Sequence, residues 1–278
     1  MKLVGRQIDN MVFGVKLVSV SLLAIALVAC GNESTTSSAV VAPVVMNDTG
    51  VSLCADQFDE GLVCATTAAT HPRQDADLGR DSDAATNSAA DGAAGFSFTK
   101  IGSDCVIDNV TGLVWEVKTA VLEDRSTLAG SLNTRANTNT YSWYDTSRAA
   151  GADQGLKNGG SCYGDEVNYV VSCDTKGYVD LINQTALCGY TDWRLPSRAE
   201  LQSIVDYSRD EPGPMLESSY FPNAHNTDSV HGLHRDWYWT SQTAAAYAKY
   251  AWAVSFNTGG DTQMAKHTPQ LIRLVRGG

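Results

Sequence analysis

DWRLPSRAELQSIVDYS, residues 192–208, carries the clearest local structural signal in the chain. Ser197 and Glu200 have the spacing of a capping box, in which each side chain bonds a backbone N–H that the start of a helix leaves unpaired. The residues behind them form one apolar face at helical spacing: Leu201, Ile204 and Val205. The stretch therefore predicts a short amphipathic helix capped by Ser197, but this does not explain the Trp-Arg pair in front of it.

A second helix is predicted just before this one, over residues 174–189. Asp174 and Thr175 are both suitable N-caps, and Gly189 is a suitable stop. Its apolar face consists of Tyr178, Leu181, Ile182 and Ala186.

Strands are predicted on both sides of the two helices. A turn followed by a strand occupies residues 108–117, and further strands are expected over 237–243, 250–256 and 270–276. An alanine- and tyrosine-rich connection joins the middle pair, and a glycine-rich turn follows Phe256. Helices and strands in this order predict an α+β fold.

The N-terminus has the features of a secretory signal. Its apolar run, LVSVSLLAIALVA over residues 17–29, is too short to span a bilayer. The segment that ends this run, LVAC, resembles the lipobox of bacterial lipoproteins, which implies a lipid on Cys30. Gly31 in the next position implies sorting to the outer membrane. Which side of that membrane the protein faces stays open, as does a start at Met1 or Met11.

Composition divides the chain into a signal peptide (1–29), an acidic low-complexity tether (30–95) and a globular domain (96–278). Apart from a small loop closed by Cys54 and Cys64, the tether has few large apolar side chains and is not expected to bury a core. Its aspartates at 75, 77, 81 and 83 do not form an Asp-x-Asp-x-Asp-Gly loop with a terminal Glu. A solvated linker is therefore predicted there rather than a calcium site.

Charge excludes one class of partner. The chain has 20 basic and 31 acidic residues, and removal of 1–29 leaves 17 basic and 30 acidic residues, a net charge of −13. No basic patch interleaved with aromatic residues occurs in the sequence, so nucleic acid is not expected as a partner.

Five segments in one order carry a family resemblance: DNVTGLVWEVK, CGYTDWRLPSRAELQSIVDYS, YWTSQT, AWAVSFNTG and RLVRGG. They resemble the C-terminal domain family named for the Legionella collagen-like protein. RLPSRAE and the closing Arg-x-Val-Arg are also similar to the formylglycine-generating, sulfatase-modifying family. Together the resemblances imply a C-type-lectin-like fold, with two helices flanking a twisted sheet whose first and last strands pair. In such a fold we expect Trp193 to fill the core where the helices meet, and Arg194 to brace the loop by bonding backbone carbonyls.

An enzyme is not expected. Formylglycine-generating chemistry needs a pair of reactive cysteines near the C-terminus, and no cysteine follows Cys188. The loop histidines His225, His231 and His234 have irregular spacing, so no metal site, catalytic residue or cofactor is predicted.

Six cysteines remain once Cys30 is lipidated, which allows fifteen pairings in an oxidising compartment. Cys173 and Cys188 bracket a helix of about 22 Å at 1.5 Å per residue and cannot bond each other. The predicted pairs are Cys54–Cys64, Cys162–Cys173 and Cys105–Cys188.

What remains is a non-catalytic binding or adhesion module in the cell envelope, held to the membrane by its lipid. The family resemblance implies glycan attachment and, in addition, assembly as a trimer, but the negative charge argues against polyanions. A glycan or protein ligand is expected at the long loop 222–236, which is followed by an aromatic strand. The candidate ligand-binding residues are His225, His231, His234, Arg235 and Trp237. The alternatives are a disordered loop, a site around Trp143, a structural lipoprotein without a ligand, or a degenerate member of the formylglycine-generating fold with enzymatic activity.

Overall fold

A computed structural model describes residues 46–67, 69–83, 85–86, 90–120, 134–148, 153–162, 172–209, 213–224 and 236–277. These residues belong to one unit, Pro43–Gly278. The lipidation candidate Cys30 lies outside the described residues, and so do His225, His231, His234 and Arg235.

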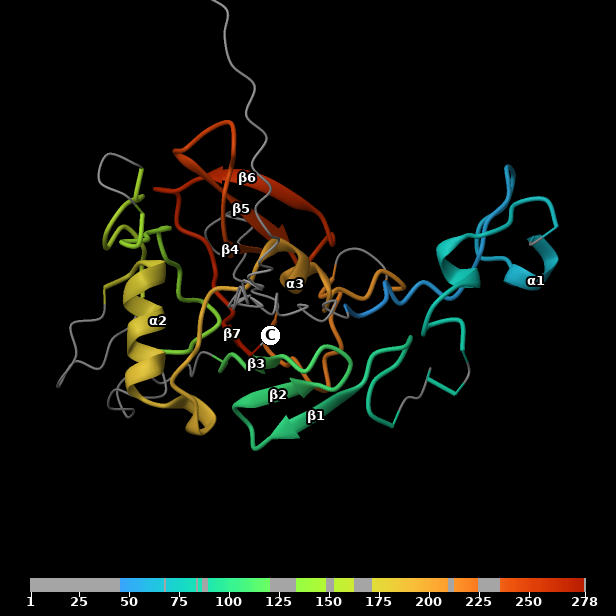
Figure 1. The fold of residues 1–278 in the computed structure, drawn as a ribbon, viewed down its shortest axis with the longest axis horizontal. Coiled ribbons are helices and arrows are strands. Elements are labelled where there is room, and N and C mark those ends of the chain that lie inside the picture. The colour runs from blue at the N-terminus through green and yellow to red at the C-terminus, as the bar shows by residue number, and fades with distance from the viewer. Residues whose placement is uncertain are drawn as a thin grey trace, which may run out of the picture. The chain divides into compact units, whose positions relative to one another are not determined.

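Two antiparallel sheets form the framework of the domain (Figure 1). The first has the order β1-β2-β3-β7, with β1 at Phe98–Ile101, β2 at Cys105–Asp108, β3 at Val114–Glu116 and β7 at Val275–Arg276. The second has the order β4-β5-β6, with β4 at Trp237–Thr243, β5 at Tyr250–Ser255 and β6 at Asp261–Ala265. The predicted α+β class, with antiparallel sheets, is confirmed.

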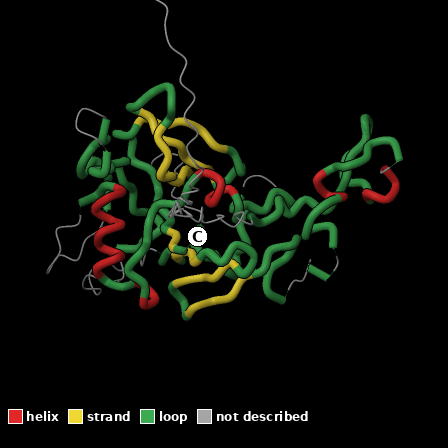
Figure 2. The backbone as a smooth tube through the Cα atoms, viewed as in Figure 1, coloured by secondary structure: helices red, strands yellow, loops and turns green. Residues whose placement is uncertain are grey.

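Helices are few and short, and loops make up most of the described chain (Figure 2). They are α1 (Cys64–Thr67), α2 (Thr175–Gln184) and α3 (Arg198–Gln202), with 3₁₀ turns at Asp75–Asp77 and Leu187–Gly189. No helix in the described part of the chain is long and apolar enough to cross a membrane.

The strand predictions were partly right: β7 covers only the last two residues of the predicted strand 270–276, and three strands were not predicted. Strand β4 has its predicted bounds, and β5 ends one residue early. Strand β3 lies within the predicted 108–117 strand and pairs with β7, so the first and last predicted strands do meet. Strands β1 and β2 precede them unpredicted, and β6 occupies the segment after the turn at Phe256.

The central strands are buried on both faces. On β4, Tyr238 faces one hydrophobic cluster and Trp239 faces the other, and both are at most 1% exposed. On β3, Trp115 lies in the same cluster as Tyr238, and Val114 lies in the same cluster as Trp239. Successive side chains of a strand point to opposite faces, so apolar neighbours along one strand indicate cover on both sides.

The helix caps form as predicted, but both helices end early. Asp174 caps α2 by accepting from the backbone N–H of Gly177, and Ser197 and Glu200 form the full capping box of α3. Helix α2 stops at Gln184, well before the predicted Gly189. The chain turns there through left-handed conformations at Ala186 and Cys188. Helix α3 lies against β4 and β5 (Figure 1).

A charged network is buried between β3 and α2. Glu116 is fully buried and accepts from Lys118 Nζ at 3.0 Å, from the hydroxyl of Tyr178 and from the backbone N–H of Leu274. Burial lowers the pKa of Lys118 to about 8, although Glu116 opposes this effect. Arg273, also fully buried, donates to the carbonyl of Glu116 at 2.6 Å. The network joins the segment that leads into β7 to strand β3 and helix α2.

Three disulfides are present, and they are the predicted pairs: Cys54–Cys64, Cys105–Cys188 and Cys162–Cys173. All six described cysteines are therefore oxidised. Cys105–Cys188 connects the start of β2 to the turn after α2, which are 83 residues apart in sequence.

Candidate functional site

The Trp-Arg pair before α3 has a structural role. The guanidinium of Arg194 makes a two-bonded pair with the Glu200 carboxylate at 2.9 and 2.7 Å, and it also donates to the carbonyls of Leu195 and Gly277. The carbonyl contacts were predicted, whereas the ion pair was not. Because Glu200 also bonds the backbone N–H of Ser197 at 2.7 Å, Arg194 holds the capping box in place.

Trp193 is buried, with 2% of its surface exposed, but not at a junction of the two helices. It belongs to the cluster that contains Tyr178 and Ile182 of α2, whereas Leu201 of α3 belongs to the other cluster. Its indole N–H donates to the carbonyl of Leu187 at 3.1 Å. The expectation of a core residue is confirmed, and the expected place between the helices is wrong.

Three aspartates come together in the segment predicted as a tether. Single carboxylate oxygens of Asp48, Asp75 and Asp81 lie within 4.8 Å of one another, a spacing that could hold a metal ion. Burial, together with the charges of Asp48 and Asp75, raises the pKa of Asp81 to about 6. Asp48 also accepts from the backbone N–H of Arg80 at 2.6 Å. The sequence did not reveal this cluster because Asp48 is 27 residues before Asp75 and outside any metal-loop spacing.

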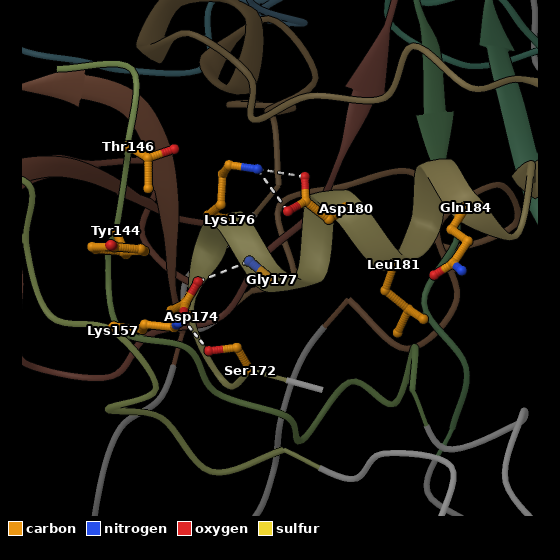
Figure 3. Close-up of a pocket in the computed structure, with 10 residues that line it drawn as sticks. All are labelled: Tyr144, Thr146, Lys157, Ser172, Asp174, Lys176, Gly177, Asp180, Leu181 and Gln184. Atoms are coloured by element: carbon orange, nitrogen blue, oxygen red, sulfur yellow. Dashed lines mark hydrogen bonds and ion pairs between the residues drawn. The ribbon is translucent and has the colours of Figure 1, made fainter. Parts of the chain in front are cut away.

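One cleft of about 490 Å³ lies along α2 (Figure 3). Three of its four charged side chains already bond one another or the backbone: Lys176 pairs with Asp180 at 2.6 Å, and Asp174 accepts from Gly177 and Asn158. Basic and acidic groups are equal in number among the described lining residues, since Lys157 and Lys176 face Asp174 and Asp180. This α2 cleft therefore offers little unsatisfied charge to a ligand.

A second cleft, of about 510 Å³, lies beside the turn between β4 and β5. The described residues that line it are Arg148, Arg198, Gln242, Thr243, Ala244, Ala245, Ala248 and Trp252. Two of them are arginines and none is acidic. The Arg198 guanidinium lies over the Trp252 ring, 4.4 Å from its centre. This β4–β5 cleft combines cationic, amide and aromatic groups.

Arg148 connects the cleft to the core. It donates to the hydroxyl of Thr243 at 2.5 Å, and its guanidinium lies 6.0 Å from the ring of the buried Trp143. On the same ring, the Lys266 ammonium lies 4.3 Å from the centre. Burial, reinforced by Arg148, lowers the pKa of Lys266. Trp143 was expected to offer an alternative binding face, but Arg148 and Lys266 lie over its ring. Of these two residues, Arg148 lines the β4–β5 cleft.

Of the five residues predicted to bind a ligand, only Trp237 is described. It is half-buried and packs against the cluster that contains Trp239. The exposed aromatics of this sheet are instead Tyr247, at 63%, and Tyr250, at 39%, whose rings meet edge to face at 6.0 Å. Both lie at the connection that also supplies Ala248 to the cleft. Tyrosines among small residues, AAAYAKY, were the available signal for an exposed aromatic surface.

Comparison with known proteins gives one result. The family model of the Lcl C-terminal domain matches residues 104–276. No curated protein and no solved structure matches the chain. The match spans all the strands from β2 to β7, both clefts and the Trp-Arg pair, and it begins after the segments predicted as signal and tether. The chain belongs to the Lcl C-terminal domain family.

Proposed function

We propose that this protein is a lipid-anchored envelope module that binds a glycan or another surface component at the β4–β5 cleft and does not catalyse a reaction. One observation carries the proposal. The cleft lies beside two exposed tyrosines and contains two arginines, an amide and an aromatic ring, with no acidic group among its described lining residues. Exposed aromatic and arginine side chains are the groups that most often anchor a ligand.

The disulfides support the non-catalytic part of the proposal. The cysteine chemistry of the formylglycine-generating family requires free thiols, and each described cysteine is in a disulfide. Membership of the Lcl C-terminal domain family is compatible with a binding module at the cell envelope.

The finer features of the proposal rest on sequence and topology. The lipobox at Cys30 supports a lipid anchor and outer-membrane sorting. A C-type-lectin-like architecture is supported by the pairing of β3 with β7, which brings the C-terminal strand back to the first sheet.

A glycan array and whole-envelope binding test the proposal. Ala248→Trp places a large ring in the cleft from an exposed position and should reduce binding at least tenfold. Ala65→Trp, at an exposed alanine of α1, adds the same ring elsewhere and should leave binding unchanged. Equal binding by both variants would reject the cleft. No binding to any envelope fraction or glycan by the native chain would favour a structural lipoprotein without a ligand.

A further inference from the structure

The β4–β5 cleft has an unbalanced charge. Arg198 is paired with Asp261 at 3.2 Å, but its side chain remains 41% exposed. Arg148 has no comparable ion pair among the described residues. Its Nε atom is buried, and no hydrogen-bond partner for it occurs in the described structure. Because Asp261 neutralises the charge of Arg198, the cleft keeps about one excess positive charge, that of Arg148.

The shape of the two cations favours a planar anion. The Arg198 guanidinium lies 4.4 Å from the centre of the Trp252 ring, and its side chain remains 41% exposed, which leaves N–H donors for a ligand. A guanidinium edge matches a carboxylate in a two-bonded arrangement, as Arg194 and Glu200 illustrate elsewhere in this chain. Gln242 uses its side-chain oxygen to accept from the backbone N–H of Arg198 at 2.9 Å, which holds the amide beside the cations.

Resting on the proposed function, we infer that the β4–β5 cleft takes a sugar with a single carboxylate, a hexuronate, whose carboxylate lies between Arg148 and Arg198. The volume of about 510 Å³ suits one or two sugar rings. The exposed Tyr247 and Tyr250 beside the cleft offer apolar ring faces to neighbouring neutral sugars.

A dense polyanion is disfavoured by charges on the rest of the chain. The mature sequence carries a net charge of −13, and Asp261 stands next to the cleft. Each additional sulfate or carboxylate would meet repulsion that one excess positive charge does not offset. A ligand with one carboxylate per two or more sugars would pair with the excess positive charge and would avoid the repulsion that further anionic groups meet.

Isothermal titration of the full chain tests this inference with three matched tetrasaccharides. One carries a single glucuronate, the second has that carboxylate methyl-esterified, and the third carries additional sulfate esters. The single glucuronate should bind at least tenfold more tightly than its ester. Sulfation should not improve the affinity. Because one charge pair is involved, the affinity should fall only weakly between 50 and 200 mM salt, about two- to threefold.

Two substitutions with opposite expected effects locate the carboxylate. Arg198→Gln should reduce the affinity for the glucuronate at least tenfold and leave the ester unchanged. Asp261→Asn removes the competing carboxylate from Arg198 and should raise the affinity several-fold. Lys157→Gln, which removes one charge from the α2 cleft, is the control and should change nothing.

The outcomes separate the two proposals. Equal binding of acid and ester, both lost in Ala248→Trp, would overturn the hexuronate inference and keep the cleft. Tighter binding of the sulfated sugar would also overturn it. Glucuronate binding that is insensitive to Arg198→Gln and Ala248→Trp would overturn both.

Discussion

Arg194 is the residue that ties three separate parts of the chain together. It pairs with Glu200 of α3, bonds the carbonyl of Gly277 near the C-terminus, and its own backbone exchanges two hydrogen bonds with Val275 of β7. Burial works to raise the pKa of Glu200, but the pairing with Arg194 and the hydrogen bonds from Ser197 together outweigh it, so the pKa is lowered. The carboxylate therefore stabilises the fold above its unfolded pKa near 4.5, and this stability is lost as the pH falls through the folded value.

Replacing Arg194 should lower the free energy of unfolding, and by more for alanine than for lysine. Arg194→Lys keeps the charge but loses the two-bonded geometry and should cost about 1 kcal/mol. Arg194→Ala leaves Glu200 without its cation and should cost about 2 kcal/mol. Denaturant unfolding at pH 7 measures both. Lys176→Ala, which breaks an exposed pair with Asp180 on α2, is the control and should change stability by less than about 0.5 kcal/mol. Equal effects of Arg194→Ala and Lys176→Ala would contradict this account.

Asp81 should make stability depend on pH in the opposite direction. Its pKa is about 6 in the folded chain, against an ordinary value of 3.8, so the folded state binds the proton more tightly than the unfolded state. The favourable contribution is complete below pH 3.8 and is lost as the pH rises through 6. Between pH 4 and 7, the native chain should therefore lose about 2 kcal/mol of stability relative to Asp81→Asn.

Chemical denaturation of both variants across this pH range measures the effect. Asp83→Asn removes an exposed carboxylate of the same segment and should follow the native curve. A native chain and an Asp81→Asn variant with parallel curves would show that Asp81 has an ordinary pKa.

At the scale of elements, the N-terminal caps of the helices and the positions of β4 and β5 were predictable because they depend on neighbouring residues. The capping box of Ser197 and Glu200 is one example, and the bounds of β4 are another. The early end of α2 was not predictable from its apolar face. The chain departs from helical geometry at Ala186 and Cys188, and Cys188 is bonded to Cys105 in β2, a distant contact that local spacing does not contain.

The candidate site was only partly predictable, for a related reason. In WYWTSQT, Trp237 was expected to bind a ligand, but both faces of β4 are covered, and its neighbours Tyr238 and Trp239 are core residues. The arginines of the β4–β5 cleft come from positions 148 and 198, which are far from β5 in sequence. Only the folded chain brings Arg198 onto Trp252.

The Cys105–Cys188 disulfide should stabilise the domain more than Cys54–Cys64. The Cys105–Cys188 bond joins residues 83 apart in sequence, whereas the Cys54–Cys64 bond joins residues 10 apart. The loss of chain entropy that a disulfide imposes on the unfolded state grows with the length of the closed loop. Replacing both cysteines of a pair by alanine should therefore cost about 2 kcal/mol more for Cys105–Cys188. Thermal unfolding of the two double variants gives the comparison. A larger loss from the Cys54–Cys64 pair would contradict the entropic argument.

At the scale of the whole molecule, the family match leaves residues 1–103 outside it, and the proposed lipid anchor lies in that part of the chain. Cys30→Ala should abolish lipid attachment and processing at that position, and the protein should leave the membrane fraction. Membrane fractionation with a palmitate label measures both. Ser38→Ala, which alters a residue after the lipobox, is the control and should stay with the membrane. A Cys30→Ala protein that is still cut and still sediments with membranes would contradict the lipid anchor.

The central claim is that the chain binds its envelope ligand at the β4–β5 cleft. Hydrogen–deuterium exchange of the full chain, with and without saccharides purified from the envelope, tests it most directly. Binding should slow exchange in residues 242–252 and 196–203, which contain Trp252 and Arg198, and this protection should disappear in Ala248→Trp. Protection confined to the α2 cleft or to residues 225–235, or protection that persists in Ala248→Trp, would contradict the claim.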